Sequence, residues 1–220
     1  MSPASKPPQR RTLTTDKVVA EAMRLADAEG LEGLSMRRLA GALGVTPMSL
    51  YNHVAGKEEL LDAMVDAVVA QIDSPEIDGD WRAMMRRRAL SMREVLMRHR
   101  WASIPLISRM TSGAAILRDT NATLGCLVTA GFTYPQADWA RNAIDNHVYG
   151  YAFQEVNYPV DPEGYKAAAS RFLPRIPASE YPFLHEAARQ IAEARYDGIT
   201  RFEFGLDLIL DGLEAWKDAE

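Results

Sequence analysis

The sequence predicts an all-α fold, in which a three-helix head containing a helix-turn-helix is joined to a larger body built as a helical bundle. Apolar residues recur at the three- and four-residue steps of amphipathic helices, whereas the alternation typical of half-buried strands is nearly absent. Ser, Thr, Pro and Gly stand where such helices would begin and end. The 220 residues, of which 47% are hydrophobic and 25% charged, suffice for a core and exclude wholesale disorder.

The head begins with a helix predicted over residues 15–29. Val18, Ala22 and Leu25 fall on one face of this helix, and Gly30 can end it.

The next two helices of the head are short and lie close together in the sequence. One follows Ser35 and closes at Gly44. The next is expected at about 47–53, because Thr46 can cap a helix whose first residue, Pro47, has no backbone N–H to satisfy. A fourth helix opens after Gly56 and is apolar over a wide arc, so it must pack on two neighbours.

The body shows the same helical spacing beyond a break near residue 79. Further helices are predicted at about 80–99, 101–111, 113–130, 135–157, 181–195 and 198–217. Many of the prolines fall within 158–182, which favours a mobile loop with one short helix near 163–172. The predicted divisions are a flexible basic tail at 1–13, a helix-turn-helix domain at 14–57 and a body at 58–220.

Charge is distributed unevenly along the chain. Residues 1–57 hold eight basic and five acidic side chains, a charge of +3, so the net charge of −5 leaves −8 for residues 58–220. A basic end on an acidic body suggests that the head meets a polyanion. Chance clustering explains the charge alone equally well.

Several classes of protein are excluded or disfavoured. The N-terminal residues are rich in Pro and basic residues, unlike a secretory signal, and no apolar run approaches the roughly 20 residues that cross a bilayer. We therefore expect a soluble, cytoplasmic protein with no membrane partner. The single cysteine, Cys126, excludes a disulfide framework and lies in an apolar run that favours a buried, inert thiol. No catalytic motif is present, so an enzyme is not expected.

The third helix carries side chains that its small core contribution does not explain. Pro47, Met48, Ser49, Tyr51, Asn52 and His53 crowd into about two turns. Small residues allow close approach to a groove floor, and Tyr and Ser suit phosphates. The alternative is that Tyr51 is a core aromatic and His53 a helix C-terminal cap, but for the set as a whole we favour recognition of DNA.

The segment from Leu34 to Leu61, LSMRRLAGALGVTPMSLYNHVAGKEELL, resembles the DNA-binding head of the TetR family of bacterial repressors. The residues in family register are Gly44-Val45, Leu50-Tyr51, His53, Lys57 and Leu60-Leu61. The body is similar, more loosely, to the tetracycline-repressor branch of that family. The similar segments are Trp81, Arg98-His-Arg-Trp101, Ala130-Gly-Phe132 and Phe202 to Leu213.

The resemblance implies a role for each of these head residues in binding double-stranded DNA. Arg37 should reach a base edge or a phosphate. The residues that should face the major groove are Thr46, Pro47, Met48 and Ser49. Tyr51 and His53 should grip the phosphate backbone beside Lys57. Because Pro47 and Met48 replace polar residues common in the family, we expect bases to be read partly by apolar contact.

The resemblance also implies a pocket for a small-molecule effector in the body, closed by the 158–182 segment. Its expected residues are Arg88, Met92, Leu96, Leu106, Asn142, Asn146, Tyr149 and Phe153. The tetracycline repressor's metal-binding histidine is replaced by Leu106, and its drug-contacting phenylalanine by Met92. We therefore expect no metal, no cofactor, and a flat or lipophilic effector other than tetracycline. The alternative is that the asparagines and Arg88 are solvated or satisfy helix ends.

A homodimer is the last implication, since the family pairs two helices of each protomer in a four-helix interface. In the last helix the apolar stripe expected there is Phe202, Leu206, Ile209, Leu213 and Trp216. The alternative is that this stripe fills the chain's own core.

The sequence as a whole predicts a ligand-responsive regulator, most simply a repressor, that binds a palindromic operator. An architectural DNA-binding protein without an effector is the main alternative.

Overall fold

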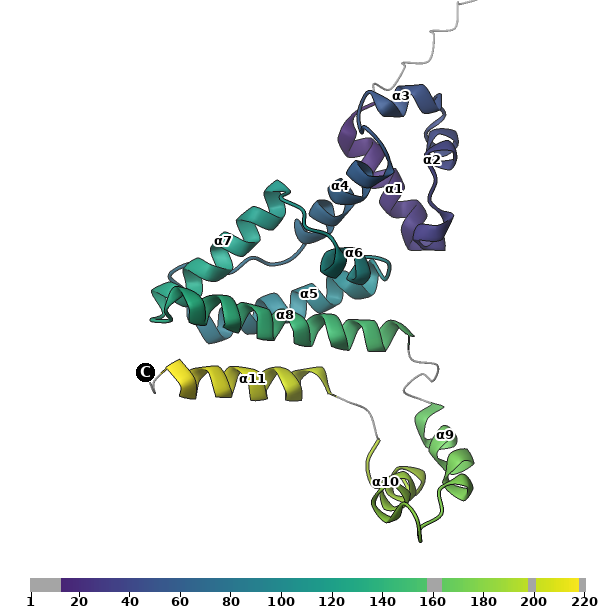
Figure 1. Ribbon diagram of the computed structural model, residues 1–220, viewed down its shortest axis with the longest axis vertical. Coiled ribbons are helices and arrows are strands. Elements are labelled where there is room, and N and C mark those ends of the chain that lie inside the picture. The colour runs from purple at the N-terminus through teal and green to yellow at the C-terminus, as the bar shows by residue number, and fades with distance from the viewer. Residues whose placement is uncertain (1–12, 158–163, 198–200, 218–220) are drawn as a thin grey trace, which may run out of the picture. The chain divides into compact units, whose positions relative to one another are not determined.

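The computed structural model describes residues 13–157, 164–197 and 201–217, and every regular element in these ranges is helical, as predicted (Figure 1). The chain divides into two compact units, residues 1–141 and 142–220. The long helix α8 (Tyr134–Asn157) crosses this boundary. The predicted tail at 1–13 lies, except for Leu13, outside the described residues.

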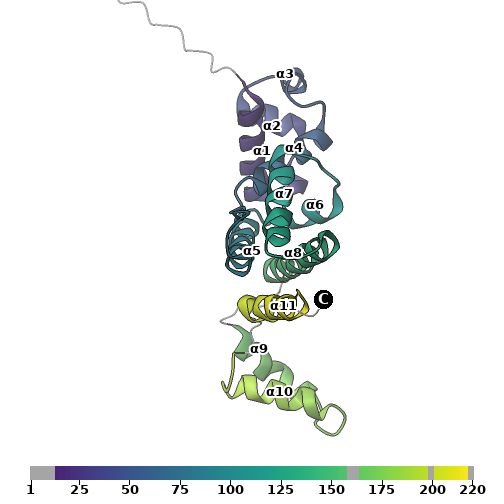
Figure 2. The same ribbon diagram turned by 90° about the vertical axis from the view of Figure 1, so that its left-hand side faces the viewer.

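The head has the predicted helix-turn-helix. Its elements are α1 (Thr15–Glu29), the 3-10 turn η1 (Leu31–Gly33), α2 (Met36–Leu43) and α3 (Pro47–Tyr51). Both views show α1, α2 and α3 together at one end of the first unit (Figure 2). Gly44 has φ 67°, a left-handed conformation that glycine adopts without strain, and it ends α2 before the turn into α3.

Hydroxyl caps start each helix of the head. The side-chain oxygens of Thr14, Ser35 and Thr46 accept hydrogen bonds from the N–H groups three residues later, at 3.3, 3.2 and 3.4 Å. Each cap satisfies a backbone donor that the helix itself leaves unpaired. The third helix ends at Tyr51, slightly earlier than predicted, because the chain turns at Asn52.

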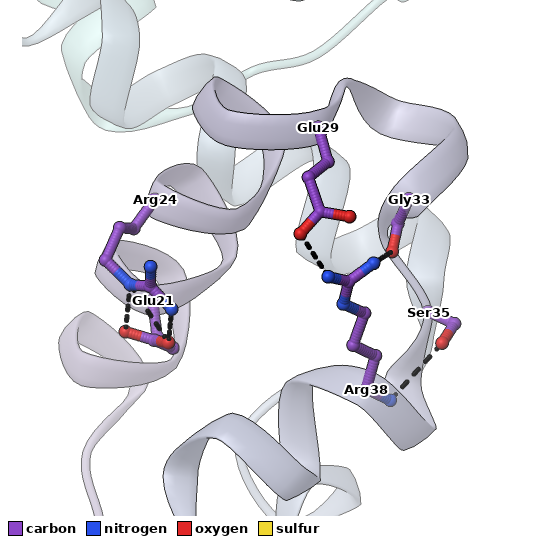
Figure 3. A network of polar contacts seen from close by, with 6 residues as sticks. All are labelled: Glu21, Arg24, Glu29, Gly33, Ser35 and Arg38. Carbon is purple, nitrogen blue, oxygen red and sulfur yellow. Dashed lines mark hydrogen bonds and ion pairs between the residues drawn. The ribbon is translucent and has the colours of Figure 1, made fainter.

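Arg38 ties the start of α2 to the end of α1 (Figure 3). Its guanidinium pairs with Glu29 and donates from Nη1 to the carbonyl oxygen of Gly33 at 3.5 Å. Arg24 and Glu21 form a separate pair within α1, with 2.6 Å between Nη2 and Oε1. Since Arg24 and Arg38 are exposed, each ion pair adds little stability.

Helix α4 (Lys57–Val69) leaves the head and packs on α1, α6 (Ser103–Ser108) and α7 (Ala114–Thr129). Its buried residues are Leu60, Leu61, Met64, Val65, Val68 and Val69, the wide apolar arc that the sequence predicted. The carboxylate of Asp66 accepts from the N–H groups of Ala115 and Ile116, at 2.9 and 3.0 Å. Asp66 therefore caps the start of α7 from the neighbouring helix.

Helix α5 (Trp81–Arg98) begins at an Asp80 cap, and Trp81 packs edge-on against Phe132 with 5.1 Å between ring centroids. Cys126 is buried, as the sequence predicted, and burial raises the pKa of its thiol. Helix α6 is shorter than the predicted 101–111.

The second unit contains α8 from Asn142 onward and the elements α9 (Tyr165–Phe172), η3 (Leu173–Arg175), α10 (Pro182–Ala192) and α11 (Phe202–Lys217). Helix α9 packs on α10. The short helix predicted near 163–172 is confirmed as α9, and η3 follows it to Arg175, while residues 158–163 lie outside the described part. Within the described residues, no helix is long and apolar enough to cross a membrane.

Candidate nucleic-acid interface

Helix α3 is anchored by one buried residue and exposes most of the others. Leu50 is completely buried, whereas Thr46, Pro47 and Met48 lie at the surface. Met48 is 73% exposed and Tyr51 48% exposed. Tyr51 is therefore not a core aromatic, and this part of the alternative reading is wrong. A long apolar side chain at the centre of an exposed helix is available for contact with a partner.

The hydroxyls of Thr46, which caps α3, and of Ser49 within α3 lie close together. Thr46 Oγ1 lies 3.0 Å from Ser49 Oγ and also caps the helix through the N–H of Ser49. Ser49 is half-buried, as is His53, which follows the end of the helix. The backbone N–H of His53 donates to the carbonyl oxygen of Leu50 at 2.8 Å, which holds the turn after α3.

Two further residues predicted to meet DNA lie outside α3, and both are exposed. Arg37 is on the first turn of α2, and Lys57 is the first residue of α4. The carboxylate of Glu58, which follows Lys57, pairs with Arg109 at 2.7 Å. Arg109 also pairs with Asp62 at 2.7 Å, and hydrogen bonds to Asp62 and then Glu58 raise its pKa. Arg109 thus offsets acidic charge beside Lys57.

In the body, the structure shows that the alternative reading of Arg88 is wrong. This residue is buried and forms a two-pronged ion pair with Asp119 of α7, at 2.7 Å from Nη2 and 3.1 Å from Nε to Oδ2. Ser74 Oγ donates to Asp119 Oδ1 at 3.0 Å. Arg88 is therefore neither solvated nor a helix-end partner, because a buried guanidinium requires a fixed counter-charge.

Asp119 was missed in the sequence, although a signal for it exists. It lies on the same face of α7 as Ala115, Thr123 and Cys126, which are all buried. An acidic residue at a buried helical position implies a basic partner on a neighbouring helix. The periodicity identified the face, but only the structure shows which basic residue meets it.

The other residues expected at the pocket divide into a buried and an exposed set. On α5, Met92 and Leu96 are buried, and Leu106 of α6 is half-buried. On α8 the buried side chains include Ile144 and Val148. The remaining pocket candidates on α8 are Asn142, Asn146 and Phe153, which are exposed, and Tyr149, which is half-buried.

The stripe expected at a dimer interface lies largely inside the chain. Phe202, Leu206 and Leu213 are buried, and the ring of Phe202 stacks on His147 with 4.9 Å between centroids. The alternative reading, that the stripe fills the chain's own core, therefore holds for these three residues. Ile209 and Trp216 are half-buried. The exposed apolar residues of α11 are instead Phe204 and Leu208, at 66% and 58% exposed.

Among the described residues, no group of three or more His, Cys, Asp or Glu side chains is arranged to hold a metal ion.

A helix-turn-helix that exposes its second helix, followed by a larger helical body, defines a class of helical DNA-binding proteins.

Comparison with known proteins identifies the family. Residues 18–64 match the family described as bacterial regulatory proteins, tetR family, and residues 74–216 match the tetracyclin repressor-like C-terminal domain. The chain belongs to the TetR family and is a DNA-binding regulator of transcription.

Relatives and solved structures agree over nearly the whole chain. The transcriptional repressor DrrR1 of Streptomyces coeruleorubidus is 36% identical, over 92% of this chain and 78% of the relative. The class C tetracycline repressor protein of Escherichia coli is 32% identical, over 93% of this chain and 92% of the relative. The structure of ActR from Streptomyces coelicolor in complex with actinorhodin has a TM-score of 0.80 and 30% identity, and covers 93% of this chain and 97% of ActR.

Proposed function

We propose that this regulator is a repressor that binds a palindromic operator as a homodimer and is released by a small, mostly apolar effector. In this proposal residues 14–57 bind DNA, and residues 58–220 bind the effector and form the dimer. The observation that carries it is the exposure of α3, whose side chains have no role in the chain's own core apart from Leu50. The name of DrrR1, a transcriptional repressor, supports the direction of regulation.

The proposed DNA contacts are those implied by the resemblance to the family, and the exposure of Arg37, Met48 and Lys57 supports them. The residues assigned to the major groove are Thr46, Pro47, Met48 and Ser49. Tyr51, His53 and Lys57 are assigned to the phosphate backbone. Arg37, exposed on α2, is assigned to a base edge or a phosphate. Because the Thr46 and Ser49 hydroxyls are close enough to bond each other, Met48 is the side chain freest to meet a base, and its chemistry suits a thymine methyl.

A selection experiment tests this assignment. Duplexes bound by the purified protein are enriched from a random library, and affinities for the selected duplex and for random DNA are measured against salt. Lys57→Ala should weaken both affinities alike and lower the salt slope by about 1, since one phosphate contact is lost. Asp78→Ala, an exposed acidic residue outside the head, is the control and should change neither. If the wild-type protein preferred no duplex over random DNA, the proposal would be wrong.

The proposed effector is flat and largely apolar. Structures of ActR hold actinorhodin or (S)-DNPA, and a structure of TetR from Acinetobacter baumannii holds minocycline. In this chain the pocket candidates Met92 and Leu96 are buried apolar side chains, Leu106 is a half-buried one, and the guanidinium of Arg88 is already neutralised by Asp119. Both observations favour an effector held by apolar contact rather than by charge.

A panel of planar polycyclic aromatic compounds, including anthraquinones, tests the effector class. A compound that binds the folded state stabilises it by RT ln(1 + [L]/Kd), so the melting temperature rises with the logarithm of the compound's concentration once this exceeds Kd. A true effector must also release the selected duplex, because a ligand with equal affinity for both states shifts no equilibrium. Met92→Trp should block release and leave the affinity for DNA unchanged. Release by the Met92→Trp variant at the wild-type concentration would place the pocket elsewhere.

The proposed dimer uses the exposed faces of α8 and α11. On α8, Ala143, Gly150 and Phe153 recur at helical spacing and are all exposed. On α11, Phe204 and Leu208 lie one turn apart. Two apolar helix faces left uncovered in a single chain suit a two-fold interface, which must be self-complementary. Sedimentation equilibrium at micromolar concentration should give twice the mass of the chain, and a single-chain mass would refute the dimer.

A further inference from the structure

The Arg98-His-Arg-Trp101 segment, which begins at the last residue of α5, meets the first helix of the head at one carboxylate. Asp27 lies in the last turn of α1. Its Oδ1 atom accepts a hydrogen bond from the indole Nε1 of Trp101 at 2.7 Å. The same oxygen lies 2.8 Å from Nδ1 of His99. One carboxylate oxygen of the head therefore holds two side chains of the body.

The connecting helix joins the same cluster. Gln71, two residues after the end of α4, places its amide within 3.0 Å of Nε2 of His99 and also donates to the carbonyl oxygen of Ala67 at 3.2 Å. The ring of Trp101 is buried, and the side chain of His99 is 12% exposed. All these residues belong to the first unit. Three elements, α1, α4 and the segment after α5, are thus joined by side chains with fixed partners.

The chemistry of this cluster favours a fixed orientation over a large gain in stability. Hydrogen bonds to an ionised carboxylate are stronger and more directional than neutral ones. Asp27 itself remains partly exposed, so water can replace either donor at a modest cost. Opening the cluster would leave α1 attached to the body mainly through its packing on α4. A contact that costs little to open but fixes the orientation of α1 relative to α4 can shift the equilibrium between orientations of the head.

We infer that Asp27 is a positioning residue, which holds the head in the orientation that binds the operator by fastening α1 to His99 and Trp101. The inference rests on the proposed dimer, because two heads must match the spacing of two half-sites. Random DNA imposes no such spacing, since it is bound through phosphates alone. Loss of the contact therefore lowers the fraction of molecules whose heads fit the operator and leaves binding to random DNA unchanged.

The experiment measures affinity for a duplex selected by the wild-type protein and for a random duplex, with Asp27→Ala, Asp27→Asn and Trp101→Phe. Asp27→Ala should weaken binding to the selected duplex by about 5- to 10-fold and change binding to random DNA by less than about 2-fold. Asp27→Asn keeps an acceptor oxygen for Trp101 and should restore most of the lost affinity. The Asp27→Ala/Trp101→Phe double variant should be no weaker than Asp27→Ala, because both changes remove the same bond.

A merely structural role predicts another pattern. Asp27→Ala would then lower the melting temperature and, measured well below it, keep the ratio of selected to random affinity at the wild-type value. That result, or additive losses in the double variant, would overturn the inference. The failure of the proposed function is distinguishable, because the wild-type protein would then show no preference for any duplex. Asp78→Ala serves as the surface control.

Discussion

In the head, the side chains assigned to DNA lie largely at the surface, whereas in the body several residues predicted to meet a ligand or a partner are buried. Arg38 and Arg88 illustrate the contrast. Arg38 pairs with Glu29 on the surface of the head, and both side chains remain more than 40% exposed. Arg88 pairs with Asp119 inside the body, and both are almost completely buried. Substitutions in the head should therefore change recognition more than folding, and substitutions in the body the reverse.

The largest expected effect separates the two faces of α11. Leu206→Glu places a carboxylate at a fully buried position, and we expect the free energy of unfolding to fall by more than about 4 kcal/mol. Leu208→Glu changes the exposed face and should keep the helical circular dichroism signal while the sedimentation mass falls to that of one chain. If the Leu208→Glu variant remained a dimer, the proposed interface would be wrong. If the Leu206→Glu variant folded normally, Leu206 would not lie on the buried face of α11.

The buried ion pair gives the next effect in size. Asp119→Ala leaves the guanidinium of Arg88 buried without its counter-charge, which should cost about 3–5 kcal/mol in urea unfolding. Replacing both partners, with Arg88→Met and Asp119→Leu, should recover most of this loss, since no charge remains buried. Glu21→Ala breaks the exposed pair with Arg24 in the head and should cost no more than about 1 kcal/mol. Equal losses for Asp119→Ala and Glu21→Ala would remove the contrast between the two regions.

The sequence predicted the head better than the body for a physical reason. The helix starts at the Thr14, Ser35 and Thr46 caps and the helix end at the left-handed Gly44 are determined by local interactions, which a sequence displays directly. The exposure of Tyr51 and Met48 followed from the same local pattern, because α3 is too short to bury more than Leu50.

Periodicity in the body identified which residues share a face but not what that face meets. The stripe of Phe202, Leu206 and Leu213 is apolar whether it packs inward or against another chain. Similarly, Arg88 stood out as polar on an apolar helix, but its partner lies 31 residues away on α7. Contacts between distant segments depend on the packing of whole helices, which no local pattern specifies.

A smaller effect compares helix caps in the two regions. Asp66 of α4 caps α7 through two backbone N–H groups, so Asp66→Ala should cost about 2 kcal/mol. Ser35 caps α2 in the head through one N–H at 3.2 Å, and Ser35→Ala should cost about 1 kcal/mol. Chemical denaturation of the two variants beside Asp78→Ala measures the difference. A larger loss for Ser35→Ala would show that the head depends more on local capping than on packing against α4.

The smallest expected change in stability comes from an exposed methionine, and its matched control is a buried one. Met48→Ala should shift the free energy of unfolding by no more than about 0.5 kcal/mol, because the side chain has little to lose on a surface helix. Met64→Ala, at a fully buried position of α4, should cost about 2–5 kcal/mol.

When DNA recognition is measured instead of stability, Met48→Ala should have the larger effect and Met64→Ala the smaller. Duplexes selected by Met48→Ala should differ from the wild-type set at one base pair in each half-site, since an apolar contact to a base edge is removed. Those selected by folded Met64→Ala should not differ. Selection by Met48→Ala of the wild-type set would show that α3 does not read bases through this residue, and the exposure of Met48 would then require another partner.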